Sequence, residues 1–206
     1  MDYNPGWETI YEIKAGDKRE GGKIYLFTGD EVKIKDLFYF SLVGSDNTAT
    51  AALVSSTGLT EEEFVAKVNI KIKGLGFKNT RIADVVGLKD GNISTAREVA
   101  QFANIALGVE EISRASLTKK YEFTTKQGRK KSIISTNELL NIFPEQKISL
   151  LGGKTGYTNS SGYCLVSKFK GADGRLIVTV VLGADSEISR FGLTRKLVDL
   201  YYNNEP

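Results

Sequence analysis

The sequence contains no histidine among its 206 residues. This absence excludes a Ser-His-Asp triad, a Cys-His dyad, a zinc helix of the H-E-x-x-H type and a zinc finger with histidine ligands. Any general base in this chain must be Lys, Asp, Glu, Tyr or the amino terminus. We therefore expect any chemistry here to proceed without imidazole. Separately, we expect neither a metal ion nor a cofactor.

Cysteine is nearly absent as well, since Cys164 is the single one. One thiol excludes an internal disulfide and a site built from several thiolates. The apolar run 162–166 around it predicts a small core residue. No apolar run approaches the length of a membrane span, and residues 1–7 have neither the basic start nor the apolar stretch of a signal peptide. Taken literally, these features predict a cytoplasmic chain.

Basic residues are in small excess, with 28 Lys and Arg against 25 Asp and Glu and a formal net charge of +3. The lysines look scattered along the sequence, so we expect no nucleic-acid partner. Hydrophobic residues make up 41% and charged residues 26%, which is typical of a folded protein, and the length suits a single domain.

The apolar pattern predicts helices in the middle of the chain and an antiparallel sheet at its end. The expected elements are a strand at 24–27, a helix at 37–43 with Asp36 as N-cap, helices at 48–54, 61–73 and from Ser94, a hairpin of 121–125 with 132–135, strands at 152–158, 163–169 and 176–182, and a helix at 187–202. Thr60 and Glu63 form a capping-box pattern before the helix at 61–73.

The predicted fold class is therefore α+β. We expect a single domain over 1–206, with a helical subregion at about 36–115 and a sheet subregion at about 150–203. The last helix should cover the sheet and bury Ile188, Phe191, Leu197, Val198 and Tyr201 against it.

Two short motifs carry the chemical signal, namely Ser45-Asp46-Asn47 and, 109 residues later, Lys154-Thr155-Gly156. A lone S-D-N is usually a turn with a helix cap, and a lone K-T-G is usually a surface turn. Together and in this order, they are two of the three elements found in penicillin-binding proteins and class A β-lactamases, the third being S-x-x-K.

The chemistry of those enzymes needs these residue types. Ser45 and Asn47 would place a hydroxyl and an amide in the cleft, to relay protons and to bind the peptide group of the substrate. Lys154 and Thr155 would hold a substrate carboxylate by charge-assisted hydrogen bonds. Gly156 would allow close backbone approach, and a backbone N–H of the same strand would complete an oxyanion hole.

Further landmarks extend the resemblance over nearly the whole chain. They are Gly21–Asp30, Asp36–Phe38, Gly44–Asn47, Leu75–Phe77, Gly87–Leu88, Ser94–Arg97, Thr136–Asn137, Leu139–Leu140, Gly153–Thr158 and Gly162–Cys164. In these stretches the sequence resembles the serine D-Ala-D-Ala carboxypeptidases, the low-molecular-mass penicillin-binding proteins with a β-lactamase/transpeptidase-like fold. The resemblance implies an exported enzyme that removes the terminal D-Ala from peptidoglycan stem peptides through a serine acyl-enzyme and is captured by β-lactams.

Within that resemblance, Tyr157 and Thr158 continue the substrate-binding strand. Family members often have His where this chain has Tyr157, and more often Gly where it has Asp46. The first difference should alter how the substrate's terminus is held. With Asp46 in the middle, the motif is closer to that of β-lactamases. A class A β-lactamase also needs a Glu upstream of the K-T-G motif, and Glu138, 16 residues before Lys154, matches that Glu only loosely. We rank that function below the carboxypeptidase.

The family's nucleophile is not found where the resemblance requires it, because no S-x-x-K string precedes Ser45. Two such strings occur later, at Ser116–Lys119 and Ser167–Lys170, and about 1.5 are expected by chance. Ser116 and Lys119 stand after the S-D-N and directly before a predicted strand, so we reject them. Ser167 and Lys170 lie on a predicted strand, where positions i and i+3 face opposite ways.

Two interpretations of this gap stay open. In the first, the chain is a carboxypeptidase fragment that lacks the N-terminal strands and the nucleophile helix, and is inactive and marginally stable alone. In the second, it is a pseudoenzyme that binds stem peptides through Ser45, Asn47, Lys154 and Thr155 without cleaving them.

Overall fold

The computed structural model describes residues 6–21, 23–143 and 147–203. The chain forms two compact units. Unit 1 comprises Met1–Ile93 and Thr118–Ser135, and unit 2 comprises Ser94–Leu117 and Thr136–Pro206. The polypeptide therefore passes from one unit to the other three times. Whether both units belong to one domain stays a prediction.

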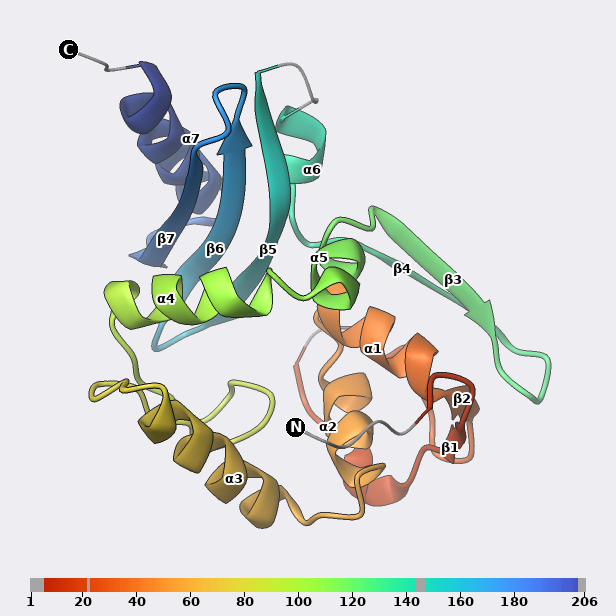
Figure 1. Cartoon of the computed structure of the whole chain (residues 1–206). Coiled ribbons are helices and arrows are strands. Elements are labelled where there is room, and N and C mark those ends of the chain that lie inside the picture. The colour runs from red at the N-terminus through yellow and green to blue at the C-terminus, as the bar shows by residue number, and fades with distance from the viewer. Residues whose placement is uncertain (1–5, 22, 144–146, 204–206) are drawn as a thin grey trace. The chain divides into compact units, whose positions relative to one another are not determined.

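Unit 1 contains three helices of more than one turn and two small antiparallel sheets among its described residues (Figure 1). Its elements are β1 (Ile10–Glu12), the 3-10 turn η1 (Ala15–Asp17), β2 (Glu31–Lys33), α1 (Ile34–Val43), α2 (Asn47–Ser55), α3 (Glu61–Gly74), β3 (Lys120–Thr124) and β4 (Lys130–Ile134). β1 pairs with β2, and β3 pairs with β4 in the predicted hairpin.

The core of unit 1 forms around the apolar helix α1 and the small residues of α2. Its buried members are Ile13, Leu26, Val32, Ile34, Leu37, Phe40, Val43, Ala49, Ala52 and Ile133. The inner face of the hairpin closes this core. The rings of Phe40 and Phe123 pack edge to face, with their centroids 4.9 Å apart. A Cβ on Gly44 would lie 1.9 Å from Ile133 Cδ1. Only glycine therefore allows the end of α1 to meet β4 this closely.

Two local predictions for unit 1 are wrong. Residues 24–27 form no strand, although Leu26 is fully buried, while Ile24 and Phe27 are exposed. Helix α1 begins at Ile34 rather than after Asp36. Asp36 lies in the first turn of that helix, where its carboxylate accepts a hydrogen bond from the Tyr121 hydroxyl at 2.7 Å. The capping box of α3, by contrast, is confirmed in both of its hydrogen bonds.

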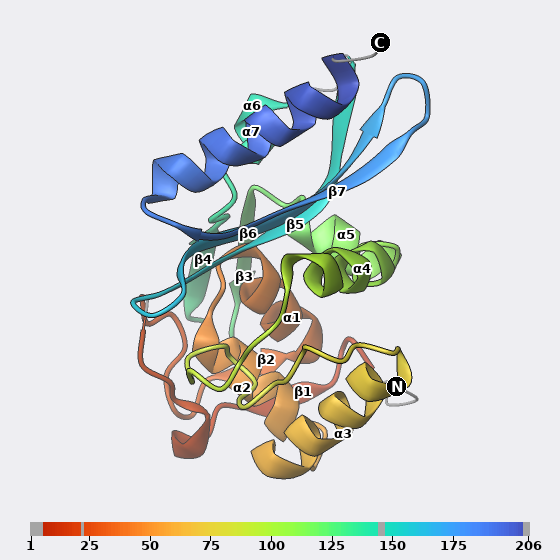
Figure 2. The same ribbon diagram turned by 90° about the vertical axis from the view of Figure 1, so that its left-hand side faces the viewer.

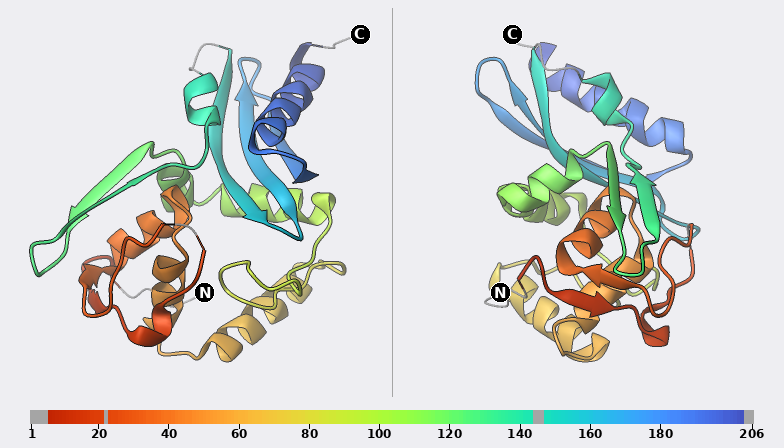
Figure 3. Two further views of the ribbon diagram at one scale, coloured as in Figure 1. Left: turned by 180° about the vertical axis from the view of Figure 1, so that it is seen from behind. Right: turned by 90° about the vertical axis from the view of Figure 1, so that its right-hand side faces the viewer.

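Unit 2 is a three-stranded antiparallel sheet with helices on both faces (Figure 2). Its elements are α4 (Ala96–Ala106), α5 (Glu110–Ser116), α6 (Leu139–Ile142), β5 (Ile148–Thr158), β6 (Gly162–Gly171), β7 (Leu176–Ala184) and α7 (Glu187–Asn203). The strand order is β5-β6-β7. Helices α6 and α7 cover one face, and α4 and α5 lie on the other (Figures 2 and 3).

The last helix covers the sheet as predicted, but through a different set of residues. Phe191 and Val198 are buried, whereas Ile188, Leu197 and Tyr201 are exposed, with Ile188 at 81%. The buried series also includes Thr194, whose hydroxyl donates to the Arg190 carbonyl at 2.8 Å. This bond satisfies the hydroxyl within the helix, so a polar residue occupies a core position that hydropathy alone would not assign to it.

The architecture confirms the predicted α+β class, with a helical part and a C-terminal antiparallel meander covered by the last helix. Among the described residues, no helix combines the length and the apolar character needed to cross a membrane.

Candidate active site

The S-D-N segment of unit 1 lies at the tight turn between α1 and α2. Ser45 has a φ of +56°, which makes it the one non-glycine residue with positive φ among those that the structure describes. The left-handed region costs an L-residue roughly 1–2 kcal/mol. Such strain is found mainly at functional sites, where the surrounding structure enforces it. Here the turn holds Ser45 in an exposed position directly before α2.

Asp46 explains why the middle residue of the motif is acidic. It is the N-cap of α2, and its carboxylate accepts a hydrogen bond from the Ala49 amide at 2.6 Å. The side chain is buried, and burial raises the pKa of Asp46. Asp46 is therefore a structural residue in this chain, and it fixes the backbone from which its two neighbours project.

Asn47, the third residue of the motif, is partly buried. Its amide nitrogen donates to the Glu20 carbonyl at 3.0 Å. A Cβ on Gly21 would approach that nitrogen to 3.2 Å. The loop before residue 22 thus limits the positions that the Asn47 amide can take.

The K-T-G motif of unit 2 lies on β5, an edge strand of the sheet, and its register with β6 is regular from Gly152 to Thr158. Two glycines before the motif allow close packing on both sides. A Cβ on Gly152 would lie 2.6 Å from Ser116 Oγ, and one on Gly153 would lie 2.7 Å from Ser167 Oγ. Gly152 and Gly153 are therefore required locally, because α5 and β6 approach this strand closely, whereas a Cβ on Gly156 would make only an ordinary contact of 3.8 Å with Cys164.

Lys154 is the residue of the motif whose pKa is shifted by its surroundings. Its ammonium group donates to the Thr155 carbonyl at 2.9 Å. Burial, and next to it the positive charge of Arg190, lowers the pKa of Lys154 to about 8. A half-buried cation near a second cation favours the binding of an anion, whose charge would offset both the desolvation and the repulsion.

The residues that follow are also held in place. The hydroxyls of Thr155 and Thr136 lie 2.5 Å apart, so the segment before α6 supports the motif. Tyr157 is half-exposed and packs on Tyr163 with ring centroids 4.3 Å apart. Its hydroxyl donates to Asn159 Oδ1 at 2.9 Å. Thr158, the last residue of β5, donates its hydroxyl proton to Ser161 Oγ at 2.8 Å in the turn to β6.

Arg190 was missed by sequence reasoning, although it is the side chain that joins α7 to the motif strand. It is 4% exposed, and its guanidinium donates to the Gly156 carbonyl at 3.3 Å. Glu187, one turn before it, accepts a second bond at 2.6 Å. The rings of Tyr163 and Phe191 face the guanidinium at 5.4 and 4.9 Å. The signal in the sequence was a Glu–Arg pair at i, i+3, which resembles an ordinary surface pair.

Ser116, the serine of the rejected S-x-x-K string, is the last residue of α5, and Lys119 lies beyond that helix. The Ser116 hydroxyl is buried and donates to the Ser113 carbonyl at 2.9 Å. It also accepts from the Gly153 amide at 3.3 Å. These bonds give Ser116 a structural part in fixing β5.

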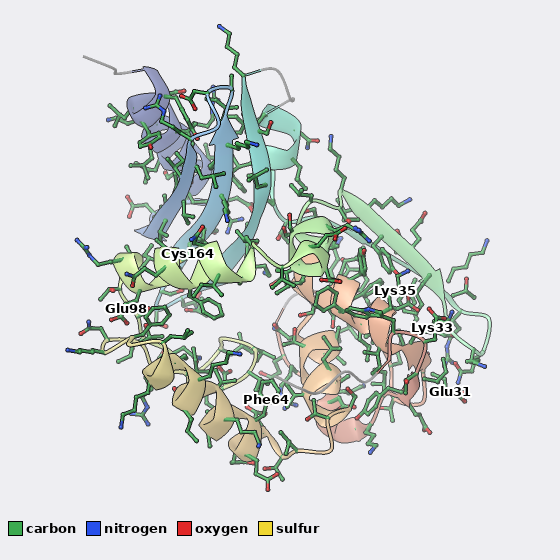
Figure 4. The ribbon with its side chains drawn as sticks, viewed as in Figure 1. Glu31, Lys33, Lys35, Phe64, Glu98 and Cys164 are labelled. Atoms are coloured by element: carbon green, nitrogen blue, oxygen red, sulfur yellow. The ribbon has the colours of Figure 1, made fainter. Side chains whose placement is uncertain are left out.

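No group of three or more metal-ligating side chains occurs within residues 6–21, 23–143 and 147–203. The thiol of Cys164, which Figure 4 labels, is half-buried near the start of β6 and lies 3.7 Å from the Ser161 carbonyl oxygen.

The fold of the chain matches that of solved penicillin-binding enzymes. The DD-transpeptidase of Streptomyces K15 superposes with a TM-score of 0.87 at 23% identity, over 96% of this chain and 80% of that one. A D-alanyl-D-alanine carboxypeptidase from Mycobacterium tuberculosis gives a TM-score of 0.85 at 23% identity, over 98% and 76%. At these identities the likeness establishes the transpeptidase-like fold.

A sequence model of the family described as D-alanyl-D-alanine carboxypeptidase matches residues 9–186, and the chain belongs to this family. It is 32% identical over 184 residues to the D-alanyl-D-alanine carboxypeptidase DacF of Bacillus subtilis, covering 89% of this chain and 46% of that protein. It is 34% identical over 181 residues to DacC of Escherichia coli, covering 87% and 43%. The chain thus spans about half the length of these relatives.

Proposed function

We propose that this chain provides the S-D-N and K-T-G elements of an exported serine D-Ala-D-Ala carboxypeptidase, which hydrolyses the terminal D-Ala of peptidoglycan stem peptides. The observation that carries the proposal is that the family match over residues 9–186 contains both motifs. Two local features support the proposal, namely the exposed Ser45 with its positive φ in one motif and the half-buried Lys154 with its lowered pKa in the other.

In unit 1, the proposal assigns the Ser45 hydroxyl to proton relay and the Asn47 amide to the peptide group of the substrate. Asp46 takes no part in the reaction, because its carboxylate is used as a helix cap. Because the turn already holds Ser45 and Asn47 in place, the entropy of ordering these side chains need not be lost during the reaction step.

In unit 2, Lys154 and Thr155 hold the C-terminal carboxylate of the substrate, and Gly156, Tyr157 and Thr158 form the strand along which the peptide lies. The carboxylate would supply the anion that two neighbouring cations favour. Thr155 can donate its hydroxyl proton to this carboxylate, while Thr136 donates to Thr155 in turn. A backbone N–H of β5 stabilises the oxyanion of the tetrahedral intermediate.

The acyl-accepting serine is, in this proposal, supplied from outside these 206 residues as an S-x-x-K element. The two such strings in the chain do not fit the role. Ser116 is engaged with Gly153, and Ser167 is completely buried on β6.

The test is release of D-alanine from an N-acetylated stem pentapeptide by the protein encoded by the complete reading frame. Lys154→Ala should reduce kcat/KM by about 100-fold or more, on the scale of losing a charged substrate contact and an electrostatic stabiliser. Lys67→Ala, on the exposed side of α3, is the matched control and should leave the rate unchanged. Undiminished activity of Lys154→Ala would contradict the assignment.

The second function, a peptide-binding pseudoenzyme, is favoured by one observation. Both motif segments are well built although no S-x-x-K precedes Ser45. If it is correct, the complete protein binds the same peptide saturably and loses that binding in Lys154→Ala, yet releases no D-alanine. D-alanine release above background would exclude it.

A further inference from the structure

Thr136 and Thr155 share a single hydrogen bond, although each has a hydroxyl that can donate one proton. Their hydroxyl oxygens lie 2.5 Å apart, and either of them can be the donor. Among the residues that the structure describes, neither hydroxyl has another hydrogen-bond partner. The pair therefore uses one of its two protons internally and has the second one left for a ligand.

The pair belongs to the part of β5 that the proposed function assigns to the substrate carboxylate. Thr155 is buried, and the Lys154 ammonium group donates to its carbonyl at 2.9 Å. Thr136 is half-buried in the segment between β4 and α6. Thr155 is thus the member of the pair that lies within the K-T-G motif, and Thr136 contacts it from a different segment of unit 2.

The position of Thr136 is fixed by the residues that follow it. Asn137 is buried, and its side-chain oxygen accepts a hydrogen bond from the Leu139 amide at 3.2 Å. Leu139 is part of the core of unit 2. A Cβ on Gly153 would approach Asn137 Nδ2 to 3.1 Å. Because Gly153 and Thr155 lie on the same face of β5, this segment packs on the face from which the Thr155 side chain projects.

A carboxylate ligand imposes one direction on the hydroxyl pair. An ionised carboxylate only accepts hydrogen bonds, so Thr155 must donate its proton to it. The Thr155 oxygen then accepts the Thr136 proton, and both protons of the pair are used. Hydrogen bonds that follow one another in this way polarise and strengthen each other.

An amide terminus requires the opposite direction. The Lys154 ammonium group is only a donor, so it takes the amide carbonyl and leaves the amide nitrogen for Thr155. When that nitrogen donates to Thr155, Thr155 must donate to Thr136. The Thr136 proton then has no acceptor among the described residues. The amide thus loses one hydrogen bond relative to the carboxylate, a factor of about three to ten in binding.

We propose that Thr136 is a positioning residue that makes the site select a free C-terminal carboxylate over an amide. It does so by holding the Thr155 hydroxyl in the donating direction, without touching the substrate itself. This role rests on the proposed function, because it concerns the carboxylate that Lys154 and Thr155 are proposed to hold.

The test uses two N-acetylated stem peptides, one ending in D-alanine and one in D-alaninamide, with the protein encoded by the complete reading frame. Mass spectrometry of the released D-alanine or D-alaninamide gives the ratio of the two kcat/KM values. Thr136→Val nearly keeps the shape of the side chain but removes its hydroxyl. It should lower the acid-to-amide ratio by about three- to tenfold. Thr136→Ser, which retains a hydroxyl, should restore the ratio.

Thr155→Val tests whether Thr136 acts through Thr155. In that background, Thr136→Val should cause no further change in the ratio, because the coupling between the two side chains is already lost. Thr124→Val removes a hydroxyl from an exposed position of β3, and this matched control should leave the ratio unchanged. Circular dichroism establishes that the variants fold alike.

An unchanged ratio in Thr136→Val, with D-alanine release by the unaltered protein intact, would overturn this role and leave the proposed function standing. The same would follow if Thr136→Ser failed to restore the ratio, or if Thr136→Val lowered it equally in the Thr155→Val background. An unaltered protein that releases no D-alanine would instead remove the proposed function, and the role of Thr136 with it.

Discussion

At the scale of single residues, the positive φ of Ser45 should lower the stability of the fold, whereas the Ser45 hydroxyl is proposed to serve the reaction. Replacing Ser45 by Gly removes the steric cost of the left-handed conformation, whereas replacing it by Ala retains that cost. We therefore expect Ser45→Gly to exceed Ser45→Ala in free energy of unfolding by about 1 kcal/mol. Urea unfolding of the two variants measures this difference.

Both variants also remove the hydroxyl, so in the complete protein both should lose D-alanine release. If Ser45→Ala were as stable as Ser45→Gly, the turn would not be strained at this position. In that case Ser45 would owe its conformation to local preference alone.

If Lys154 holds the substrate carboxylate, as proposed, that binding should depend on pH. Its pKa of about 8 lies below the ordinary value for lysine, since burial and Arg190 disfavour the charged form. Above pH 8 the free protein loses the proton that attracts the carboxylate. The dissociation constant of an amine-blocked D-Ala-D-Ala peptide should therefore rise by up to about tenfold per pH unit above that value.

Calorimetric titration from pH 6 to 10 measures this dependence, and Lys154→Arg is the matched variant, because guanidinium stays protonated over the whole range. Its affinity should be independent of pH, even if weaker overall. The same slope in both proteins would assign the titration to another group.

At the scale of elements, the hairpin is anchored by a buried ion pair between Asp30 and Lys131. Burial raises the pKa of Asp30, but the hydrogen bond from Lys131 and further partners outweigh it and place that pKa below its ordinary range. A carboxyl with a depressed native pKa stabilises the fold above its unfolded pKa, and that stabilisation is lost as pH falls through the native value. Asp30 should thus contribute to unfolding below about pH 4.

Asp30→Asn leaves the buried Lys131 uncompensated and should lower the free energy of unfolding by roughly 3–5 kcal/mol at pH 7. It should also flatten the loss of stability in acid. Glu8→Gln, which breaks the exposed pair with Lys33, is the control and should have little effect. Urea unfolding at pH 7 and at pH 3 distinguishes them, and equal effects of both substitutions would refute an anchoring role.

Elements whose signals are local could be predicted from the sequence. The capping box at Thr60 and Glu63, the hairpin around Gly128 and the three-stranded meander each rest on neighbouring residues, and all three are found in the structure. The segment 24–27 could not be predicted correctly, because a short run of apolar and aromatic residues does not reveal whether a partner strand exists. For α7, the buried side includes the polar residues Thr194 and Arg190, which hydropathy assigns to the surface and whose hydrogen bonds to the Arg190 and Gly156 carbonyls form only in the folded chain.

At the scale of the whole molecule, the sequence identified the two motifs but not the residues that support them. Ser116, Thr136 and Arg190 reach β5 from α5, from the segment before α6 and from α7. These contacts join residues up to 37 positions apart in the chain, and nothing in the local sequence marks them. Arg190 in particular alters the charge of the site through the pKa of Lys154, an effect that depends on three-dimensional distance alone.

The 206-residue chain by itself should not be acylated by penicillin, because it contains no S-x-x-K string before the S-D-N motif. Incubation of the 206 residues with a fluorescent penicillin should leave no covalent label on a denaturing gel, whereas the protein from the complete reading frame should be labelled. Ser116→Ala is the decisive variant for the alternative. If the chain were labelled and Ser116→Ala abolished the label, the buried hydroxyl at the end of α5 would be the nucleophile after all. A label that persists in Ser116→Ala would instead point to a different serine, and mass spectrometry of the modified peptide would identify it.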